Sequence, residues 1–351
     1  MKIGIVGLPL SGKTSLFLTL VGDSFRKEEH LQEKSSYNIG NIKLEDPRLL
    51  HLAEVFGSKR KTFSEITLMD LILYEKKENK FFEHSIFRDA EALVGVIRCF
   101  DYPGLAPFDP LKEIETIEEE FILKDLEVVN KRIEKIEQDI KKGKKEEEKE
   151  LKVLDRLRST LEENRALREI NLDKEEEKLI SGFKFLSQKP IFFVLNLDER
   201  MDLDTIEKIK KSLLKENYPF ILASLRLEKE LESLEEKERE TFLESLGIKE
   251  TLKRRFISAS LSFLNLVTFF TVKGEEAKAW LIKKNTPALK AAGKIHTDME
   301  RGFIKAEVIN YADFIKAGSS LNEARKQGLV RLESKEYLVQ DGDIIDFRFA
   351  V

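Results

Sequence analysis

The most constraining feature of the sequence is a glycine-rich segment close to its start. Residues 7–14 read GLPLSGKT and match the pattern G-x-x-x-x-G-K-[ST]. They follow a short apolar run at 2–6 and open an apolar-periodic segment at 14–20, which predicts the order strand, loop, helix. In that order, backbone N–H groups of the loop and the helix N-terminus surround phosphate oxygens. The segment therefore predicts a nucleoside triphosphate site.

Two side chains of this loop are the catalytic candidates. Lys13 is expected to contact the β- and γ-phosphates, and the Thr14 hydroxyl is expected to ligate Mg²⁺, the predicted cofactor. Asp70 ends a second apolar run, where its carboxylate can hold the same ion, although an ordinary strand-end aspartate is the alternative. The predicted phosphate-binding residues are Gly7, Leu8, Pro9, Leu10, Ser11, Gly12, Lys13, Thr14 and Ser15.

A second candidate motif follows the apolar run at 190–196. GTPases usually carry Asn-Lys-x-Asp at such a place, where the Asp carboxylate accepts hydrogen bonds from guanine. Here the four residues are Asn196, Leu197, Asp198 and Glu199. The longer Glu199 cannot take the position of that Asp, whereas the Asn196 amide can serve the donor and acceptors of adenine. The mismatch therefore weakens the case for guanine and permits adenine, with Asn196, Leu197 and Glu199 as the candidate base-side residues. Together with the family resemblance described below, it makes ATP the expected ligand, with GTP possible.

Residues 111–178 differ in composition from the rest of the chain, because Lys and Glu are frequent in them. Apolar positions recur at helical spacing in two stretches separated by Gly143. The pattern predicts two long helices folded into an antiparallel coiled-coil hairpin, with one solvated helix or a disordered charged run as the alternatives. The two stripes are Val129, Ile133, Ile136, Ile140 and Leu151, Leu154, Leu157, Leu161.

The C-terminal part of the chain has a third kind of pattern, with strand-like alternation and turn sequences. Residues 304–309 alternate like a half-buried strand, and Asp341-Gly342-Asp343 is a tight-turn sequence before another apolar run. A chain of 351 residues is also too long for one core. We predict an α/β nucleotide-binding domain in two parts (1–108 and 181–266), an inserted hairpin (109–180) and a small β-rich domain (267–351).

Composition excludes several classes of protein. With a formal net charge of −4 the chain is no polycation, so contact with nucleic acid would need a local basic surface. Cys99 is the single cysteine, which leaves no internal disulfide, and the four histidines show no metal-ligand spacing. No apolar stretch reaches the roughly 20 residues of a membrane span. The expectation is a cytoplasmic protein with no membrane contact.

The chain resembles the Obg-like ATPase family of the YchF type over essentially its whole length. The strings that carry the resemblance are the loop at 7–14, Asp46-Pro47-Arg48-Leu49, Arg98-Cys99-Phe100, Asn196-x-x-Glu199, and blocks at 269–271, 279–280, 291–298, 300–304 and 339–343. The resemblance implies a P-loop NTPase G-domain with an inserted hairpin and a C-terminal TGS domain of β-grasp type. It also implies slow hydrolysis of ATP to ADP and phosphate, association with the ribosome through its large subunit, and a role in translation or stress response. Ser224 and Leu225 fall in the family's last base-contacting loop.

Departures from the family pattern concern the segments that sense the γ-phosphate. The family's second motif usually offers a Thr, where this chain has Lys34 followed by two serines. Its third motif usually reads Asp-x-Ala-Gly, where this chain has Asp70-Leu71-Ile72-Leu73 and no glycine to let the backbone approach the phosphate. These differences lead to the hypothesis that nucleotide binding persists while hydrolysis is weakened.

Two alternatives therefore remain beside a slow ATPase. One is a nucleotide-binding adaptor that is impaired in hydrolysis and docks on ribosome or RNA. The other is direct RNA contact by a basic face of the C-terminal domain, for which a merely solvated charged surface is the competing interpretation. The residues of that face are Lys290, Lys294, Arg301 and Lys305.

Overall fold

The computed structural model describes residues 1–22, 37–71, 87–142, 148–232 and 250–350, together with 234, 238 and 248; of Leu71 and Glu232 only the backbone is described. The chain divides into two compact units. One, here called the P-loop unit, comprises Lys2–Gly40 and Thr67–Arg255. The other, here called the C-terminal unit, comprises Met1, Asn41–Ile66 and Phe256–Val351. The predicted domain boundaries at 108, 180 and 266 are not defined by this division and stay a prediction.

A six-stranded sheet organises the P-loop unit. Its strand order is β2-β4-β1-β5-β6-β7. The pairs of β1 with β4 and β5, of β5 with β6, and of β6 with β7 are all parallel, so the carboxyl ends of these five strands meet at one edge. The strands are β1 (Lys2–Val6), β2 (Tyr37–Leu44), β4 (Ser64–Leu71), β5 (Ala92–Cys99), β6 (Ile191–Leu197) and β7 (Phe220–Ala223).

The centre of this sheet is covered on both faces, because every residue of β5 is buried. At Gly95 an added Cβ would lie 2.5 Å from the Cδ1 atom of Phe193 on the neighbouring strand, so only glycine fits beside that ring. The helices of this unit are α1 (Lys13–Val21), α5 (Pro110–Lys141), α6 (Glu148–Glu162), α7 (Lys174–Ile180), α8 (Leu203–Lys215) and α9 (Leu225–Glu232), and α11 (Leu252–Phe263) begins in it.

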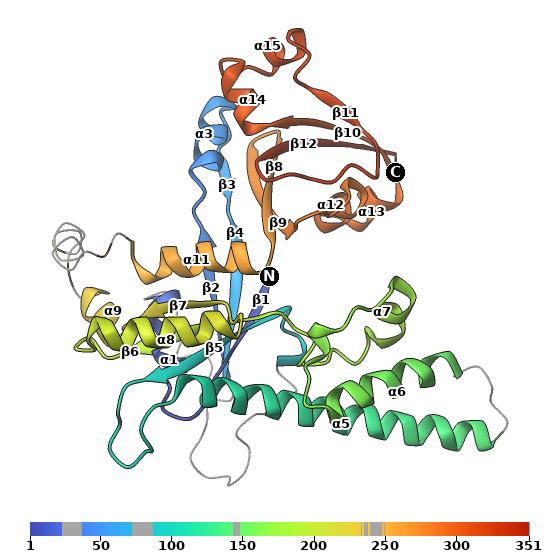
Figure 1. The fold of residues 1–351 in the computed structure, drawn as a ribbon. Coiled ribbons are helices and arrows are strands. Elements are labelled where there is room, and N and C mark those ends of the chain that lie inside the picture. Colours follow the sequence, from blue (N-terminus) through green and yellow to red (C-terminus); the bar gives the residue numbers. More distant parts are fainter. Residues whose placement is uncertain are drawn as a thin grey trace. The chain divides into compact units, whose positions relative to one another are not determined.

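Helices α5 and α6 occupy the charged segment for which the sequence predicts a hairpin. They lie side by side in Figure 1, and their apolar stripes pack into one cluster. Residues 143–147, including Gly143, lie outside the described residues. Local chemistry explains where α5 begins: the Asp109 side chain accepts a hydrogen bond from the Lys112 backbone N–H, and Pro110 stands at the first helical position.

Asp125 attaches α5 to the segment that leads into β6. Its side chain is fully buried. Its Oδ1 atom accepts from the Leu186 backbone N–H at 3.0 Å, and its Oδ2 atom accepts from the Ser187 N–H and hydroxyl, both at 2.7 Å. Burial raises the pKa of Asp125, while these donors lower it. Three buried donors therefore depend on this one carboxylate.

The C-terminal unit is built on a second sheet, with the order β11-β10-β12-β8-β9-β3. The alternating segment predicted at 304–309 forms β10, and Gly342 (φ 82°) makes the turn before β12. The strands are β3 (Arg60–Thr62), β8 (Leu266–Lys273), β9 (Glu276–Lys283), β10 (Phe303–Asn310), β11 (Arg331–Glu333) and β12 (Asp343–Phe349). The helices are α3 (Pro47–Val55), α12 (Ala288–Ile295), α13 (Thr297–Arg301), α14 (Tyr311–Lys316) and α15 (Leu321–Lys326).

Residues far apart in sequence meet in this unit at Arg48, in α3. Its guanidinium donates to Asp46 at 2.7 Å and to Asp341 at 2.6 Å, and lies 5.2 Å from the centre of the Phe270 ring. β3 likewise pairs in parallel with β9. These interactions explain why Asn41–Ile66 group with the C-terminal unit. Within this range only β3 joins the second sheet, whereas the parts of β2 and β4 that it contains pair in the first. Over the described residues, no helix is long and apolar enough to cross a bilayer.

Replacing Asp125 by Ala should cost about 3 kcal/mol of unfolding free energy, because it leaves buried N–H and hydroxyl donors without an acceptor. Urea denaturation followed by circular dichroism measures the change. Glu137→Gln, an exposed change on the same helix, should stay within about 0.5 kcal/mol of the parent. A loss below about 1 kcal/mol for Asp125→Ala would mean that water replaces the carboxylate, against its buried position.

Candidate functional site

The glycine-rich loop joins the carboxyl end of β1 to α1. Both pattern glycines are required by close approaches: an added Cβ would lie 2.5 Å from the Val96 carbonyl oxygen at Gly7, and 2.6 Å from Asn196 Nδ2 at Gly12. Gly12 also has φ 106°, and Leu10 between them has φ 64°, a left-handed conformation that costs energy for a residue with a Cβ. The loop therefore has a backbone conformation that depends on glycine at both positions. Pro9 and Leu10 are exposed, Leu8 is half-buried, and Ser11 is buried beneath them.

Lys13 is the first residue of α1 and folds back over the loop. Its Nζ atom donates to the carbonyl oxygens of Gly7 at 3.0 Å and Leu8 at 2.9 Å. Burial lowers the pKa of Lys13, and the charge of Asp70 partly restores it. Two of the three ammonium N–H bonds are used, so one remains for an anion above the loop. The first turn of α1 contains no acidic residue that would repel such an anion.

Thr14 and Asp70 lie together, as the sequence predicts for a shared metal. The Thr14 hydroxyl donates to Asp70 Oδ2 at 3.0 Å, and the Asn38 amide donates to the same oxygen at 3.3 Å. Asp70 is fully buried, and its Oδ1 atom has no hydrogen-bond partner among the described residues. Burial, the largest influence, raises the pKa of Asp70, against the opposing effects of Thr14, Asn38 and Lys13.

This arrangement fits Mg²⁺. A hydroxyl and an orphaned carboxylate oxygen are the hard ligands that the ion prefers, and Mg²⁺ usually keeps few protein ligands beside water and phosphate. The described residues contain no cluster of three or more His, Cys, Asp or Glu that would hold a metal ion by itself. Asn38, which shares Asp70, is a residue that the sequence analysis missed. It lies in β2, and no motif marks it.

Asn196 connects two loops at the carboxyl edge of the sheet. Its Nδ2 atom donates to the Ser11 carbonyl oxygen at 2.9 Å, and its Oδ1 atom accepts from the Leu225 N–H at 3.2 Å. The side chain is 7% exposed. The geometry thus gives Asn196 a bracing role that the sequence analysis did not foresee, and contact with a base stays a prediction. Leu225 is buried, with Cδ1 2.9 Å from where a Gly12 Cβ would lie.

The other predicted base-side residues lie around this brace. Leu197 packs against the core cluster of β5 and β6, and Ser15 is exposed in the first turn of α1. Ser224 carries a buried hydroxyl with no hydrogen-bond partner among the described residues. Glu199 Oε1 is 3.9 Å from the Nε atom of Arg226, a weak contact that sequence spacing did not reveal. The positions that differ in the second and third family motifs, Lys34 and Leu73, lie outside the described residues.

A parallel α/β sheet, a glycine loop that opens a helix with Lys and Thr, and an Asp on the adjacent strand define the P-loop nucleotide-binding class. A family model described as "YchF-GTPase_C: Protein of unknown function (DUF933)" matches residues 266–350. With full-length relatives at up to 35% identity, the chain belongs to the YchF family. The comparisons therefore confirm both the resemblance and the mixed α/β fold.

The similar proteins cover the chain from end to end. The "Ribosome-binding ATPase YchF" of Bacillus subtilis is 35% identical over 100% of both chains, and that of Haemophilus influenzae is 35% identical over 100% of this chain and 99% of the relative. The solved structure of the Schizosaccharomyces pombe YchF GTPase has a TM-score of 0.80 at 26% identity, covering 99% of this chain and 97% of the other. A GTP binding protein from Pyrococcus horikoshii, at 19% identity, full coverage of both chains and a TM-score of 0.61, supports the fold alone.

The raised pKa of Asp70 predicts the pH dependence of magnesium–nucleotide binding. Metal binding needs the carboxylate, so affinity should fall as pH is lowered through the pKa of Asp70, and the fall should begin at a higher pH than for an ordinary aspartate. Asp70→Asn should weaken Mg²⁺-dependent binding at least roughly tenfold. The affinity of this variant should then change with pH only as far as the nucleotide itself titrates. Fluorescent-nucleotide titrations from pH 5 to 8 measure both; parallel pH curves for parent and variant would contradict the assignment.

Proposed function

We propose that this chain is a P-loop ATPase that hydrolyses ATP to ADP and phosphate and associates with the ribosome in the cytoplasm. The observation that carries the proposal is the convergence of Lys13, Thr14 and buried Asp70 at the carboxyl edge of a parallel sheet. The curated relatives named above, which match the chain over its full length, are called ribosome-binding ATPases.

In this proposal, each residue of the site has a defined part in the reaction. Backbone N–H groups of residues 7–15 and the N-terminus of α1 hold the phosphate oxygens. Lys13 exchanges the carbonyls of Gly7 and Leu8 for the β- and γ-phosphates and balances charge as water attacks the γ-phosphorus. Mg²⁺, when bound, neutralises charge on the phosphates. Thr14 Oγ1 and Asp70 Oδ1 would hold that ion, directly or through water.

The segment after β6 supports a preference for adenine. Glu199 stands where a guanine-reading Asp would be, and its carboxylate lies toward Arg226. The Asn196 amide is engaged with Ser11 and Leu225, so it sets the distance between the phosphate loop and the 224–225 loop. A base would then lie against Leu197, Ser224 and Leu225. GTP remains a second possible ligand, because the Schizosaccharomyces pombe relative is called a GTPase.

A second candidate is a nucleotide-binding adaptor with impaired hydrolysis. The observation that favours it is Leu73, in the place of the family's glycine, together with Lys34 in the place of its threonine. Without a glycine at this place the backbone N–H approaches the γ-phosphate less closely, which reduces transition-state stabilisation and leaves phosphate binding by the loop at 7–14 intact. Nucleotide binding and hydrolysis therefore need separate measurements.

Calorimetric titration of the full chain should show tighter binding of ATP and ADP than of GTP and GDP. Single-turnover assays with radiolabelled ATP should show slow phosphate release that Lys13→Ala abolishes, since the variant loses the charge that faces the phosphates.

Lys135→Ala, which makes the same change at an exposed lysine of α5 outside the site, serves as the control for hydrolysis. Tighter binding of guanine nucleotides would contradict the adenine assignment. Tight ATP binding without phosphate release would replace the ATPase by the adaptor.

For docking on the ribosome, we propose the TGS-like C-terminal segment, residues 267–351, with the large subunit and its RNA as the partner. Lys290, Lys294, Arg301 and Lys305 lie on α12, α13 and β10, at the surface of the C-terminal unit. Lys290 is paired with Glu300 at 2.6 Å, whereas the other three form no ion pair within the described ranges. Three unpaired cations on adjacent elements can meet phosphate groups.

Reversing the charge of Lys294, Arg301 and Lys305 to Glu should reduce co-sedimentation with ribosomes several-fold at about 0.1 M salt and flatten its dependence on salt. The matched control reverses Lys208, Lys211 and Lys215, three exposed lysines of α8. Equal losses in both triple variants would show that overall charge is responsible and that the basic face is not.

A further inference from the structure

A cavity of about 630 Å³ lies in the P-loop unit, away from the glycine loop. Pro190 and Ile191 line it at the amino end of β6, and Tyr218 and Pro219 line it just before β7. Since these strands are parallel to β1, the cavity is at the amino edge of the sheet, opposite the phosphate loop. Its volume is in the range of pockets that bind small molecules. Neither the nucleotide nor its metal accounts for it.

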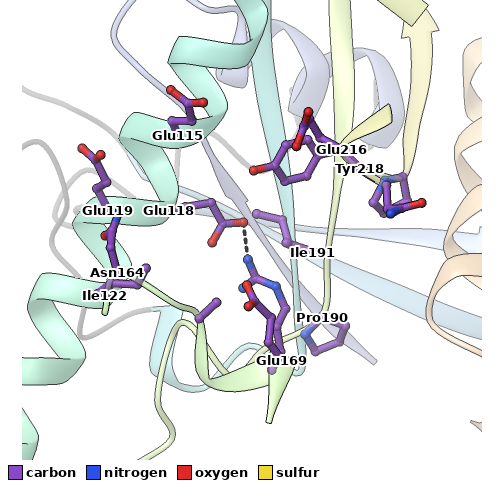
Figure 2. Close-up of a pocket in the computed structure, with 14 residues that line it drawn as sticks. Glu115, Glu118, Glu119, Ile122, Asn164, Glu169, Pro190, Ile191, Glu216 and Tyr218 are labelled. Atoms are coloured by element: carbon purple, nitrogen blue, oxygen red, sulfur yellow. Dashed lines mark ion pairs between the residues drawn. The ribbon is translucent and has the colours of Figure 1, made fainter. Parts of the chain in front are cut away.

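The lining of this cavity is strongly acidic. It includes five glutamates and one arginine, and no lysine (Figure 2). Glu115, Glu118 and Glu119 come from one face of α5, Glu216 follows α8, and Glu169 lies in the short helical turn after α6. Glu115, Glu119 and Glu216 form no ion pair with any described residue, so only solvent and Arg168 are present to offset the negative charge of this lining.

Glu118 is the group inside this ring that most needs a partner. It is 8% exposed, and Figure 2 shows its carboxylate pointing from α5 toward Ile191. Its Oε1 atom forms an ion pair with Arg168. Both carboxylate oxygens are buried, and neither has a hydrogen-bond partner among the described residues. A buried charged oxygen without a donor is costly, and a hydrogen-bonding cation brought into the cavity lowers that cost.

The remaining lining indicates what kind of cation fits. The described residues contain no cluster of His, Cys, Asp and Glu close enough to hold a metal ion. The carboxylates are therefore spaced around the cavity and do not converge on a single ion. Between them lie apolar groups of Ile122, Ile191 and the two prolines. Burial and the charges of Glu118 and Glu115 raise the pKa of Tyr218, so its hydroxyl stays protonated. Separated carboxylates around apolar walls match ammonium groups joined by methylene chains.

We propose that this cavity binds a free linear polyamine, with ammonium groups at Glu115, Glu118 and Glu216 and its methylene chain against Ile191. Binding would link α5, which continues into the hairpin, to the β6 and β7 ends of the sheet. The proposal does not depend on nucleotide binding, since the two sites are at opposite edges.

Calorimetric titration of the nucleotide-free full chain with spermidine at about 0.15 M salt tests the proposal. We expect saturable binding of one spermidine per chain. The double variant Glu115→Gln/Glu216→Gln removes two exposed charges from separate elements and should weaken it roughly tenfold. n-Butylamine, with one ammonium group, should bind far more weakly than spermidine.

The matched control, Glu134→Gln/Glu137→Gln, makes the same charge change on exposed positions of α5 outside the cavity and should bind spermidine like the parent. Equal weakening in both double variants, or complete competition by MgCl₂ at equal ionic strength, would show diffuse counterion binding and overturn the proposal. Absence of saturable binding by a parent chain that is folded by circular dichroism would overturn it as well. Equal affinity for n-butylamine would mean that a single lysine-like ammonium suffices, and would also overturn it.

Discussion

The two hydrogen bonds of the Asn196 side chain hold together the parts of the nucleotide site. One bonds the Ser11 carbonyl in the loop after β1, and the other bonds the Leu225 N–H after β7. These loops are separated by more than 200 residues of sequence and lie at the same edge only because the strands are parallel. The amide is buried, so losing either bond would leave a polar group unsatisfied. Everything proposed for the base and the phosphates assumes the spacing that this side chain sets.

Buried charge is the second constraint on the structure. Asp70 and Lys13 are both drawn toward their neutral forms by burial, yet each favours the charged form of the other. The buried carboxylate of Asp125 is stabilised differently, because three hydrogen-bond donors satisfy its oxygens. Glu118 has an ion pair with Arg168, but neither of its oxygens has a hydrogen-bond partner among the described residues. The contrast separates a carboxylate that serves packing from carboxylates that leave an oxygen open to a ligand.

The two edges of the parallel sheet therefore carry opposite chemistry. At the carboxyl edge, a helix N-terminus, backbone N–H groups and Lys13 favour an anion. At the amino edge, glutamates from α5 and the ends of two other helical segments favour a cation. α5 contributes to the second edge directly and packs on β5, which is paired to β1, the strand that precedes the phosphate loop. A ligand at either edge would contact elements of one packed core.

Sequence alone was sufficient where the physics is local. A phosphate cradle is made by consecutive backbone groups, so the glycine spacing, Lys13 and Thr14 could be recognised without a structure. The stripes of α5 and α6 and the alternation of β10 follow from helical and strand periodicity in the same way. Only the tertiary structure decided that Asn38 shares the Asp70 carboxylate, that Asn196 faces the loops, that residues 41–66 group with the C-terminal unit, and that five distant glutamates surround one cavity. The reason is that such partners are chosen by which surfaces pack and which strands pair, and neighbours brought together in this way leave no regular spacing in the chain.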